Sequence, residues 1–232
     1  MFSIAAHRGG NTVDSIIDSI DKKYDYVELD VHLSSDGKII VQYSPLVCIN
    51  GTSNHIENIR YYELDQIDKD KLLLLEDVFE ITKGKIGVII DIKHGTRFYP
   101  HIGKCVAEKI AEYDLFNETW IISFDHKCLN EAKKTNPSVK ISPMYVARLF
   151  DECNYWKNNC ADGIEICNEY LDQDSISMAH RMGLTMIGWC SQDSEELLKL
   201  VKMGIDIITI EKDDPILSRL RTIQSNVRDE ID

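Results

Sequence analysis

Short apolar stretches rich in β-branched residues alternate along the chain with amphipathic stretches of helical period. The strand-like stretches are residues 4–6, 26–33, 39–41, 86–92, 119–123, 139–144, 163–166, 184–189 and 205–210. The helix-like stretches are residues 12–22, 75–82, 101–113, 127–135, 173–182 and 194–203. Gly183 and Gly204 follow two of the predicted helices, where a glycine commonly ends a helix and turns the chain. The pattern therefore predicts an α/β fold.

Strands that alternate with helices indicate right-handed βαβ units and a parallel sheet. About eight such units in 232 residues come close to the ~250 residues of a typical (β/α)8 barrel. An open, doubly wound sheet would more often carry a G-x-G-x-x-G loop after its first strand, and this sequence has none. We therefore expect a TIM (β/α)8 barrel that forms a single domain over residues 1–232.

One segment departs from this alternation. Residues 44–70 carry polar and turn-forming residues, among them Pro45 and the pair Asn50-Gly51, and their periodicity is weak. We expect a short irregular insertion there, after the second βα region and at the barrel mouth. The charged tail, residues 225–232, is expected to fray.

Composition narrows the classes of function. A formal net charge of −13 argues against nucleic acid and anionic membranes as partners, because both require a basic surface. No stretch approaches the ~18 apolar residues of a membrane span, and the N-terminus lacks the layout of a signal peptide. Seven scattered cysteines without a C-x-x-C pair fit reduced thiols. We expect a cytoplasmic protein without stable membrane insertion; the oligomeric state stays open.

Polar side chains collect where several of the predicted strands end. These residues are His7, Arg8, Glu28, Asp30, Asp91, Lys93, Ser123, Asp125, Glu165 and Trp189. Core packing alone would not select charged groups at such positions. In a (β/α)8 barrel the carboxyl ends of the strands build the active site. The pattern therefore predicts one polar site at one end of the barrel.

Three of these polar residues, Glu28, Asp30 and Asp91, indicate a site for a cation. Glu28 and Asp30 lie on one face of an extended strand, because side chains alternate with period two, and Asp91 ends another strand. Carboxylate oxygens are hard ligands that suit Mg²⁺ or Ca²⁺. Such an ion polarises a phosphoryl oxygen and reverses the local field of an acidic protein.

The neighbouring residues complete a phosphoryl-transfer site. Arg8 and Lys93 are suited to bind phosphate oxygens, Arg8 as a bidentate fork and Lys93 as a point charge. His7 can give or take a proton at neutral pH, because the ordinary pKa of a histidine is ~6.5. The residues by themselves therefore indicate metal-assisted chemistry on a small phosphate substrate.

Several motifs resemble those of the glycerophosphodiester phosphodiesterase family. Residues 6–12 read A-H-R-G-G-N-T, similar to the family's A-H-R-G…E-N-T opening, and residues 27–33, V-E-L-D-V-H-L, resemble its E-x-D-V-x-L segment. Further similar segments are L-E-D-V at 75–78, I-D-I-K at 90–93, S-F-D at 123–125, G-W-C at 188–190 and G-I-D-I-I-T at 204–209. The resemblance spans nearly the whole chain, with the motifs in the family's order.

The resemblance implies a TIM barrel that hydrolyses glycerophosphodiesters to an alcohol and glycerol 3-phosphate with a divalent cation, Mg²⁺ or Ca²⁺. It also implies roles for individual residues. These are the cation ligands Glu28, Asp30 and Asp91, the acid/base group His7, the phosphate-binding Arg8 and Lys93, and Trp189 as a wall of the substrate site.

The sequence departs from the family's pattern at the second catalytic histidine, where it has Tyr43, followed by Ser44 in place of an aspartate. A tyrosine hydroxyl, with an ordinary pKa of ~10, can protonate a leaving alkoxide but is a poor base. Gly10 stands where the family has a glutamate, and Asp91 replaces the glutamate that is the usual third ligand. We expect an intact cation site with Tyr43 as the substitute catalytic group.

Other histidines are alternatives for the missing group: His94 follows a strand end, and His55 lies in the insertion, whereas His32 is expected to be structural.

Three functions stay open at this point. The first is an active phosphodiesterase, and the second is a relative diverted to transfer or cyclisation. The third is a pseudoenzyme that binds a phosphodiester or a partner without turnover.

Overall fold

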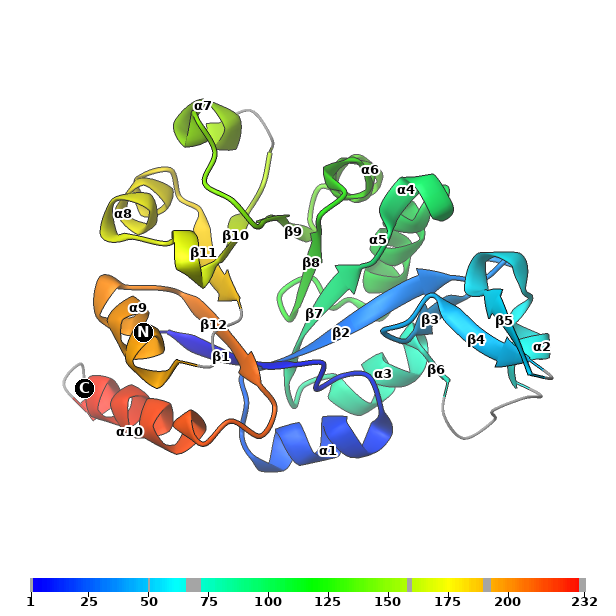
Figure 1. The fold of residues 1–232 in the computed structure, drawn as a ribbon, viewed down its shortest axis with the longest axis horizontal. Coiled ribbons are helices and arrows are strands. Elements are labelled where there is room, and N and C mark those ends of the chain that lie inside the picture. Colours follow the sequence, from blue (N-terminus) through cyan, green and yellow to red (C-terminus); the bar gives the residue numbers. More distant parts are fainter. Residues whose placement is uncertain (1, 50, 66–71, 158–159, 190–192, 230–232) are drawn as a thin grey trace.

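The computed structural model, which describes residues 2–49, 51–65, 72–157, 160–189 and 193–229, is built around a closed parallel barrel (Figure 1). Its strands are β1 (Ser3–His7), β2 (Tyr26–Leu33), β7 (Gly87–Ile92), β8 (Thr119–Ser123), β9 (Lys140–Tyr145), β10 (Gly163–Cys167), β11 (Thr185–Trp189) and β12 (Ile207–Glu211). They pair in this order, and β1 pairs with both β12 and β2, which closes the sheet. The predicted TIM barrel is confirmed.

Helices surround the barrel and cover its outer face (Figure 1). They are α1 (Val13–Asp21), α3 (Leu75–Thr82), α4 (Gly95–Phe98), α5 (Ile102–Tyr113), α6 (His126–Thr135), α7 (Glu152–Lys157), α8 (Gln173–Arg181), α9 (Ser194–Met203) and α10 (Ile216–Asp229). The helix α10 continues through much of the tail that we expected to fray. Within the described part of the chain, no helix is both long and apolar enough to cross a membrane.

One predicted strand lies outside the barrel. Residues 39–41 form β3 (Ile39–Val41), which pairs antiparallel with β2. The linker between β2 and β3 is too short for a crossover helix, so the chain can only return as a hairpin. β6 (Leu73–Leu74) then pairs antiparallel with β3.

The insertion after β3 has regular structure in its described part. β4 (Leu46–Ile49) and β5 (Thr52–His55) form an antiparallel hairpin, followed by the 3-10 turn η1 (Ile56–Asn58) and helix α2 (Tyr61–Asp65). A small apolar cluster supports these elements: Ile40, Ile56, Ile59, Leu64 and Leu74. Residues 66–70 of the predicted insertion lie outside the described residues.

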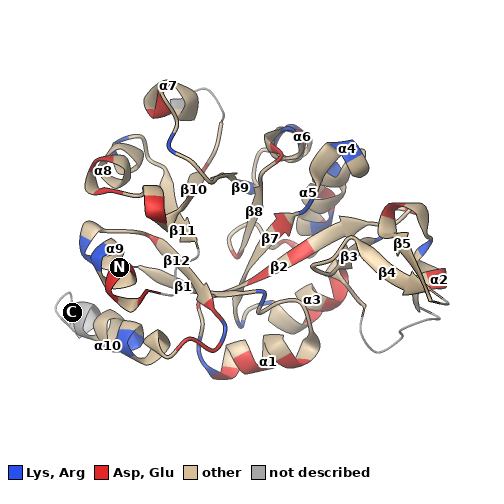
Figure 2. Cartoon of the chain, viewed as in Figure 1, with Lys and Arg blue, Asp and Glu red and all other residues tan. Residues whose placement is uncertain are grey.

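The side chains of each barrel strand alternate between two apolar regions. Val27, Leu29, Ile164 and Ile166 belong to the cluster between the strands and the helices. The inward-facing cluster is Ala5, Ile89, Trp120, Ile122, Met144, Ile187 and Ile207. Toward the carboxyl ends of the strands this apolar filling gives way to buried acidic groups, which are visible on β2 and β7 in Figure 2. The barrel therefore places charge at one end of a dry interior.

Helices α5 and α6 approach each other closely at Gly103. A Cβ atom on this residue would lie 2.0 Å from the carbonyl oxygen of Cys128. We expect Gly103→Ala to force the helices apart and to lower the free energy of unfolding by about 1–3 kcal/mol. Thermal unfolding measures the effect, with the exposed neighbour Lys104→Ala as the control. Equal melting temperatures for Gly103→Ala and the wild type would contradict this close packing.

Candidate active site

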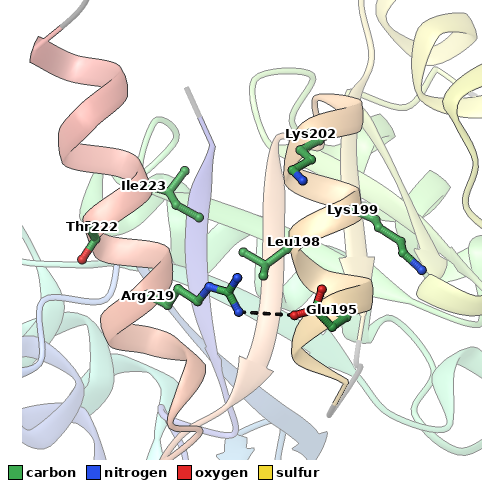
Figure 3. Close-up of a pocket in the computed structure, with 7 residues that line it drawn as sticks. All are labelled: Glu195, Leu198, Lys199, Lys202, Arg219, Thr222 and Ile223. Carbon is green, nitrogen blue, oxygen red and sulfur yellow. Dashed lines mark hydrogen bonds and ion pairs between the residues drawn. The ribbon is translucent and has the colours of Figure 1, made fainter.

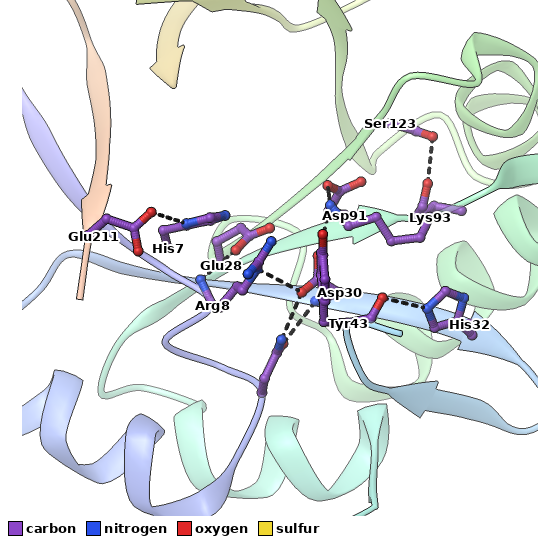
Figure 4. Close-up of polar contacts among 12 residues, drawn as sticks. His7, Arg8, Glu28, Asp30, His32, Tyr43, Asp91, Lys93, Ser123 and Glu211 are labelled. Atoms are coloured by element: carbon purple, nitrogen blue, oxygen red, sulfur yellow. Dashed lines mark hydrogen bonds and ion pairs between the residues drawn. The ribbon is translucent and has the colours of Figure 1, made fainter. Parts of the chain in front are cut away.

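Three carboxylates from two adjacent strands meet at the carboxyl end of the barrel (Figure 4). Glu28 and Asp30 come from β2 and Asp91 from β7, and the register pairs Asp30 directly with Asp91. One oxygen of each side chain lies within 4.8 Å of the others, and all three residues are buried. Among the described residues this is the cluster with the spacing of a metal site.

Lys93 is the cation closest to this cluster. Its Nζ lies 2.8 Å from Oδ1 of Asp30 and also donates a hydrogen bond to Asp91. Burial by itself lowers the pKa of Lys93, but the charges of Asp91 and Asp30 outweigh burial and raise it. Lys93 is therefore charged at neutral pH.

One lysine does not neutralise three buried carboxylates. Burial, followed by the charges of Asp30 and Asp91, raises the pKa of Glu28 to about 8. Burial also raises the pKa of Asp91 to about 6, against the opposing charge of Lys93. Oδ1 of Asp91 is buried without a hydrogen-bond partner among the described residues. A set of hard oxygen ligands with excess negative charge fits a divalent cation.

Arg8 and Asn11 fix the carboxylates from the loop after β1. The backbone N–H of Arg8 donates to Oε2 of Glu28 at 2.6 Å, and Arg8 adopts a left-handed backbone conformation with φ of 52°. Asn11 donates to Oδ2 of Asp30 at 2.8 Å and accepts the backbone N–H of Asp30 at 3.0 Å. Nε of Arg8 lies 3.8 Å from Oδ2 of Asp30, so its guanidinium stands beside the cluster.

His7 is held by a carboxylate from the last strand. Its Nδ1 lies 2.8 Å from Oε1 of Glu211, and the register pairs the two residues across β1 and β12. Since a carboxylate accepts, Nδ1 donates, and the neutral ring keeps Nε2 as its free base. Nε2 lies on the side of the ring away from Glu211 (Figure 4).

Tyr43 stacks on Arg8: Cζ of Arg8 lies 3.6 Å from the centre of the Tyr43 ring, which is the geometry of a cation–π contact. The backbone carbonyl of Tyr43 accepts from Nε2 of His32 at 3.3 Å, and the hydroxyl of Tyr99 lies 2.9 Å from Nδ1 of His32. Burial lowers the pKa of His32 to about 4, so the ring is neutral and can accept from Tyr99. In this arrangement His32 supports the backbone of Tyr43.

Three further residues that the sequence suggested for the site lie outside the carboxylate cluster. Trp189 ends β11, packs partly against the interior cluster and has its ring 5.8 Å from that of Phe124. The ring of His94 stacks on His32 at 5.8 Å, outside the carboxylate cluster. His55 lies in the β4–β5 hairpin.

The sequence reasoning assigned no role to Glu211 or Asn11. Glu211 carried a usable signal, because a charged residue follows the apolar run of β12 as it does at the other strand ends. For Asn11 the only signal in the sequence was its place in the N-T motif. Its two hydrogen bonds to Asp30 join positions 19 residues apart.

A hollow lies on the outside of the barrel, between α9 and α10 (Figure 3). Lys199 and Lys202 line it, and Arg219 pairs with Glu195 at 3.4 Å. It lacks buried acidic groups and lies in the helical layer, so the carboxyl end of the barrel remains the candidate active site.

The fold and this site define a TIM-barrel protein with a buried acidic cluster at the carboxyl ends of its strands. The family model "Glycerophosphoryl diester phosphodiesterase family" matches residues 5–214. The chain belongs to this family of phosphoric diester hydrolases.

Known proteins are similar to this chain over almost its full length. A glycerophosphodiester phosphodiesterase of Caldanaerobacter subterraneus is 24% identical, with 94% of this chain and 97% of the relative covered. A glycerophosphodiester phosphodiesterase structure from Parabacteroides distasonis has a TM-score of 0.79 at 21% identity, covering 97% and 98% of the two chains. An Oleispira antarctica phosphodiesterase in complex with sn-glycerol-3-phosphate has a TM-score of 0.79 at 19% identity, covering 94% and 96%.

The raised pKa of Glu28 predicts how stability depends on pH when cations are removed by a chelator. Between the ordinary value of 4.5 and about 8, the folded protein keeps a proton on Glu28 that the unfolded chain has released. Stability should therefore fall as the pH rises through this window. We expect Glu28→Gln to flatten the decline in melting temperature between pH 5 and 8. An unchanged decline in this variant would contradict the raised pKa.

Proposed function

We propose that the protein is a metal-dependent hydrolase that cleaves glycerophosphodiesters to an alcohol and glycerol 3-phosphate. The observation that carries the proposal is the buried cluster of Glu28, Asp30 and Asp91 with Arg8 and Lys93 beside it. The Oleispira antarctica phosphodiesterase, which shares the fold, is described with sn-glycerol-3-phosphate as its product. This supports a small phosphodiester as the substrate here.

Glu28, Asp30 and Asp91 are the proposed ligands of the divalent cation, Mg²⁺ or Ca²⁺. When bound, the ion supplies Lewis acidity and neutralises charge that develops on the phosphoryl oxygens. Arg8 and Lys93 bind the same oxygens, and the stack on Tyr43 holds the Arg8 guanidinium at the mouth.

His7 and Tyr43 are the proposed proton-transfer groups. Nε2 of His7 takes a proton from the attacking water while Glu211 holds Nδ1 and stabilises the imidazolium that forms. The hydroxyl of Tyr43 gives a proton to the leaving alkoxide, and its side chain is 54% exposed, so the proton can return from solvent. Trp189 forms a wall for the substrate, and a cytoplasmic location remains a prediction.

The activity is tested by the release of glycerol 3-phosphate from glycerophosphocholine, glycerophosphoethanolamine and glycerophosphoglycerol. We expect turnover with Mg²⁺ or Ca²⁺ and none with a chelator. In water labelled with ¹⁸O, hydrolysis places the label in the phosphate. A cyclic, unlabelled product would instead indicate the diverted, cyclising function. Binding without any product would indicate a pseudoenzyme.

Replacing His7 separates proton transfer from cation binding. We expect His7→Ala to lower kcat by about 10²–10⁴-fold, because it removes an acid/base group, and to leave cation affinity measured by calorimetry unchanged. Glu28→Ala should abolish both cation binding and turnover. Full activity in His7→Ala would overturn the proposed mechanism.

Tyr43→Phe keeps the ring that stacks on Arg8 and removes only the hydroxyl. If that hydroxyl protonates the leaving group, kcat falls by about 10²-fold or more while cation affinity and melting temperature stay at wild-type values. Steady-state kinetics on glycerophosphocholine measures the change. A wild-type kcat in Tyr43→Phe would contradict this role of the hydroxyl, and Tyr43 would then contribute only the stacking contact with Arg8.

A further inference from the structure

A fourth carboxylate faces the interior of the barrel from the wall opposite the cation cluster. Glu165 lies in the middle of β10, and its neighbours Ile164 and Ile166 pack outward in the cluster beneath the helices. Because side chains alternate along a strand, Glu165 points inward. Its register partners Met144 and Ile187 belong to the interior cluster, which agrees with this direction.

Glu165 and Glu28 lie across the barrel from one another. Three strands separate β2 from β10 on either side of the closed order, so the two strands are diametrically opposed. Interior side chains of such barrels form layers from alternate strands. The residues of one layer can be found by following the strand pairing around the barrel and allowing for the tilt of the strands. One layer found in this way contains Glu28, Ile122, Glu165 and Thr209.

Glu165 is as deeply buried as the proposed ligands, and one of its carboxyl oxygens has no hydrogen-bond partner in the described part of the chain. Its exposed fraction is 2%, against 4% for Glu28 and 1% for Asp91. No described residue makes a hydrogen bond to Oε2 of Glu165. A buried carboxyl oxygen without a partner is costly, and such groups in folded proteins are usually matched by a ligand, an ion or an ordered water. The unsatisfied oxygen therefore points to something bound in the barrel.

A positively charged partner would fit this place, because Glu165 faces Glu28 across the barrel. Burial, followed by the charges of Asp91 and Glu28, raises the pKa of Glu165 well above its usual range. Lys93 opposes this effect only weakly, since it is already paired with Asp30 and Asp91. A divalent cation in the cluster would relieve the repulsion felt by all of these carboxylates.

We propose that Glu165 is a fourth acidic residue of the cation site, which binds the ion from the opposite wall through a water molecule. Glu165 is not among the residues whose ligand atoms lie within 4.8 Å of each other, so an intervening water fits better than direct contact. Mg²⁺ and Ca²⁺ commonly retain waters in protein sites. Glu165 thus acts as a positioning residue for the ion. The inference rests on the proposed function, because it concerns the same cation site.

Calorimetric titration of the chelator-stripped full chain with Ca²⁺ and with Mg²⁺ tests the proposal without any turnover. We expect Glu165→Gln, which keeps the shape of the side chain, to weaken binding roughly 10- to 100-fold, as the loss of an outer partner does. Glu165→Asp should restore part of the affinity. Glu195→Gln on α9 removes the same charge outside the barrel and should bind as the wild type does.

Unfolding in the presence of chelator separates binding from folding. Glu165→Gln should melt at or above the wild-type temperature there, because it removes a repelled buried acid. Wild-type cation affinity in Glu165→Gln would overturn the inference and leave the proposed function standing. A wild type that binds the cation but hydrolyses no glycerophosphodiester would overturn the proposed function alone. A wild type that binds neither cation would overturn both.

Discussion

Repulsion among carboxylates that are buried together at the end of the barrel is the interaction on which the rest of the site depends. Glu28, Asp30 and Asp91 are brought together by the parallel register of β2 and β7, which the folding of the whole barrel imposes. Solvent screens their charges weakly there, because all three side chains are buried above the apolar interior cluster. The contacts around the cluster can be understood as responses to this concentrated charge.

Each response comes from a different part of the chain. Lys93 supplies an ammonium from the position directly after β7, and the Arg8 backbone supplies an N–H through a left-handed conformation. Such a conformation costs of order 1 kcal/mol for a residue other than glycine, and it is maintained where the surroundings compensate. Here the compensation is the hydrogen bond to the buried Glu28. When all three carboxylates are ionised, Lys93 and Arg8 offset only two of their charges, which is why a divalent cation is central to the proposal.

The fold was largely predictable from local pattern. Short apolar runs and capped helices, such as α1 with its Thr12–Ser15 capping box, carry their own signal. The composition of β3 does not distinguish it from the barrel strands, and only the short linker before it reveals the hairpin. Helix α10 begins just after Pro215, a residue that favours helix starts, but the charged tail gave no sign that the helix extends to Asp229.

The sequence indicated several of the polar residues that gather at one end of the barrel, but not Glu211 or Asn11 and not the contacts among them. Polar residues at strand ends indicated His7, Glu28, Asp30 and Asp91, because a barrel gathers such ends. The pairing of His7 with Glu211 joins residues 204 positions apart, and the stack of Tyr43 on Arg8 depends on how the insertion leaves β3. Neither follows from spacing along the chain.

The central claim is that the buried carboxylates hold a divalent cation against the phosphate of the substrate. Anomalous diffraction from crystals soaked with Mn²⁺ and glycerol 3-phosphate tests it most directly. We expect a manganese peak among Glu28, Asp30 and Asp91, in contact with a phosphate oxygen that Arg8 or Lys93 also binds. Phosphate bound at the barrel mouth with no manganese among these carboxylates would contradict it.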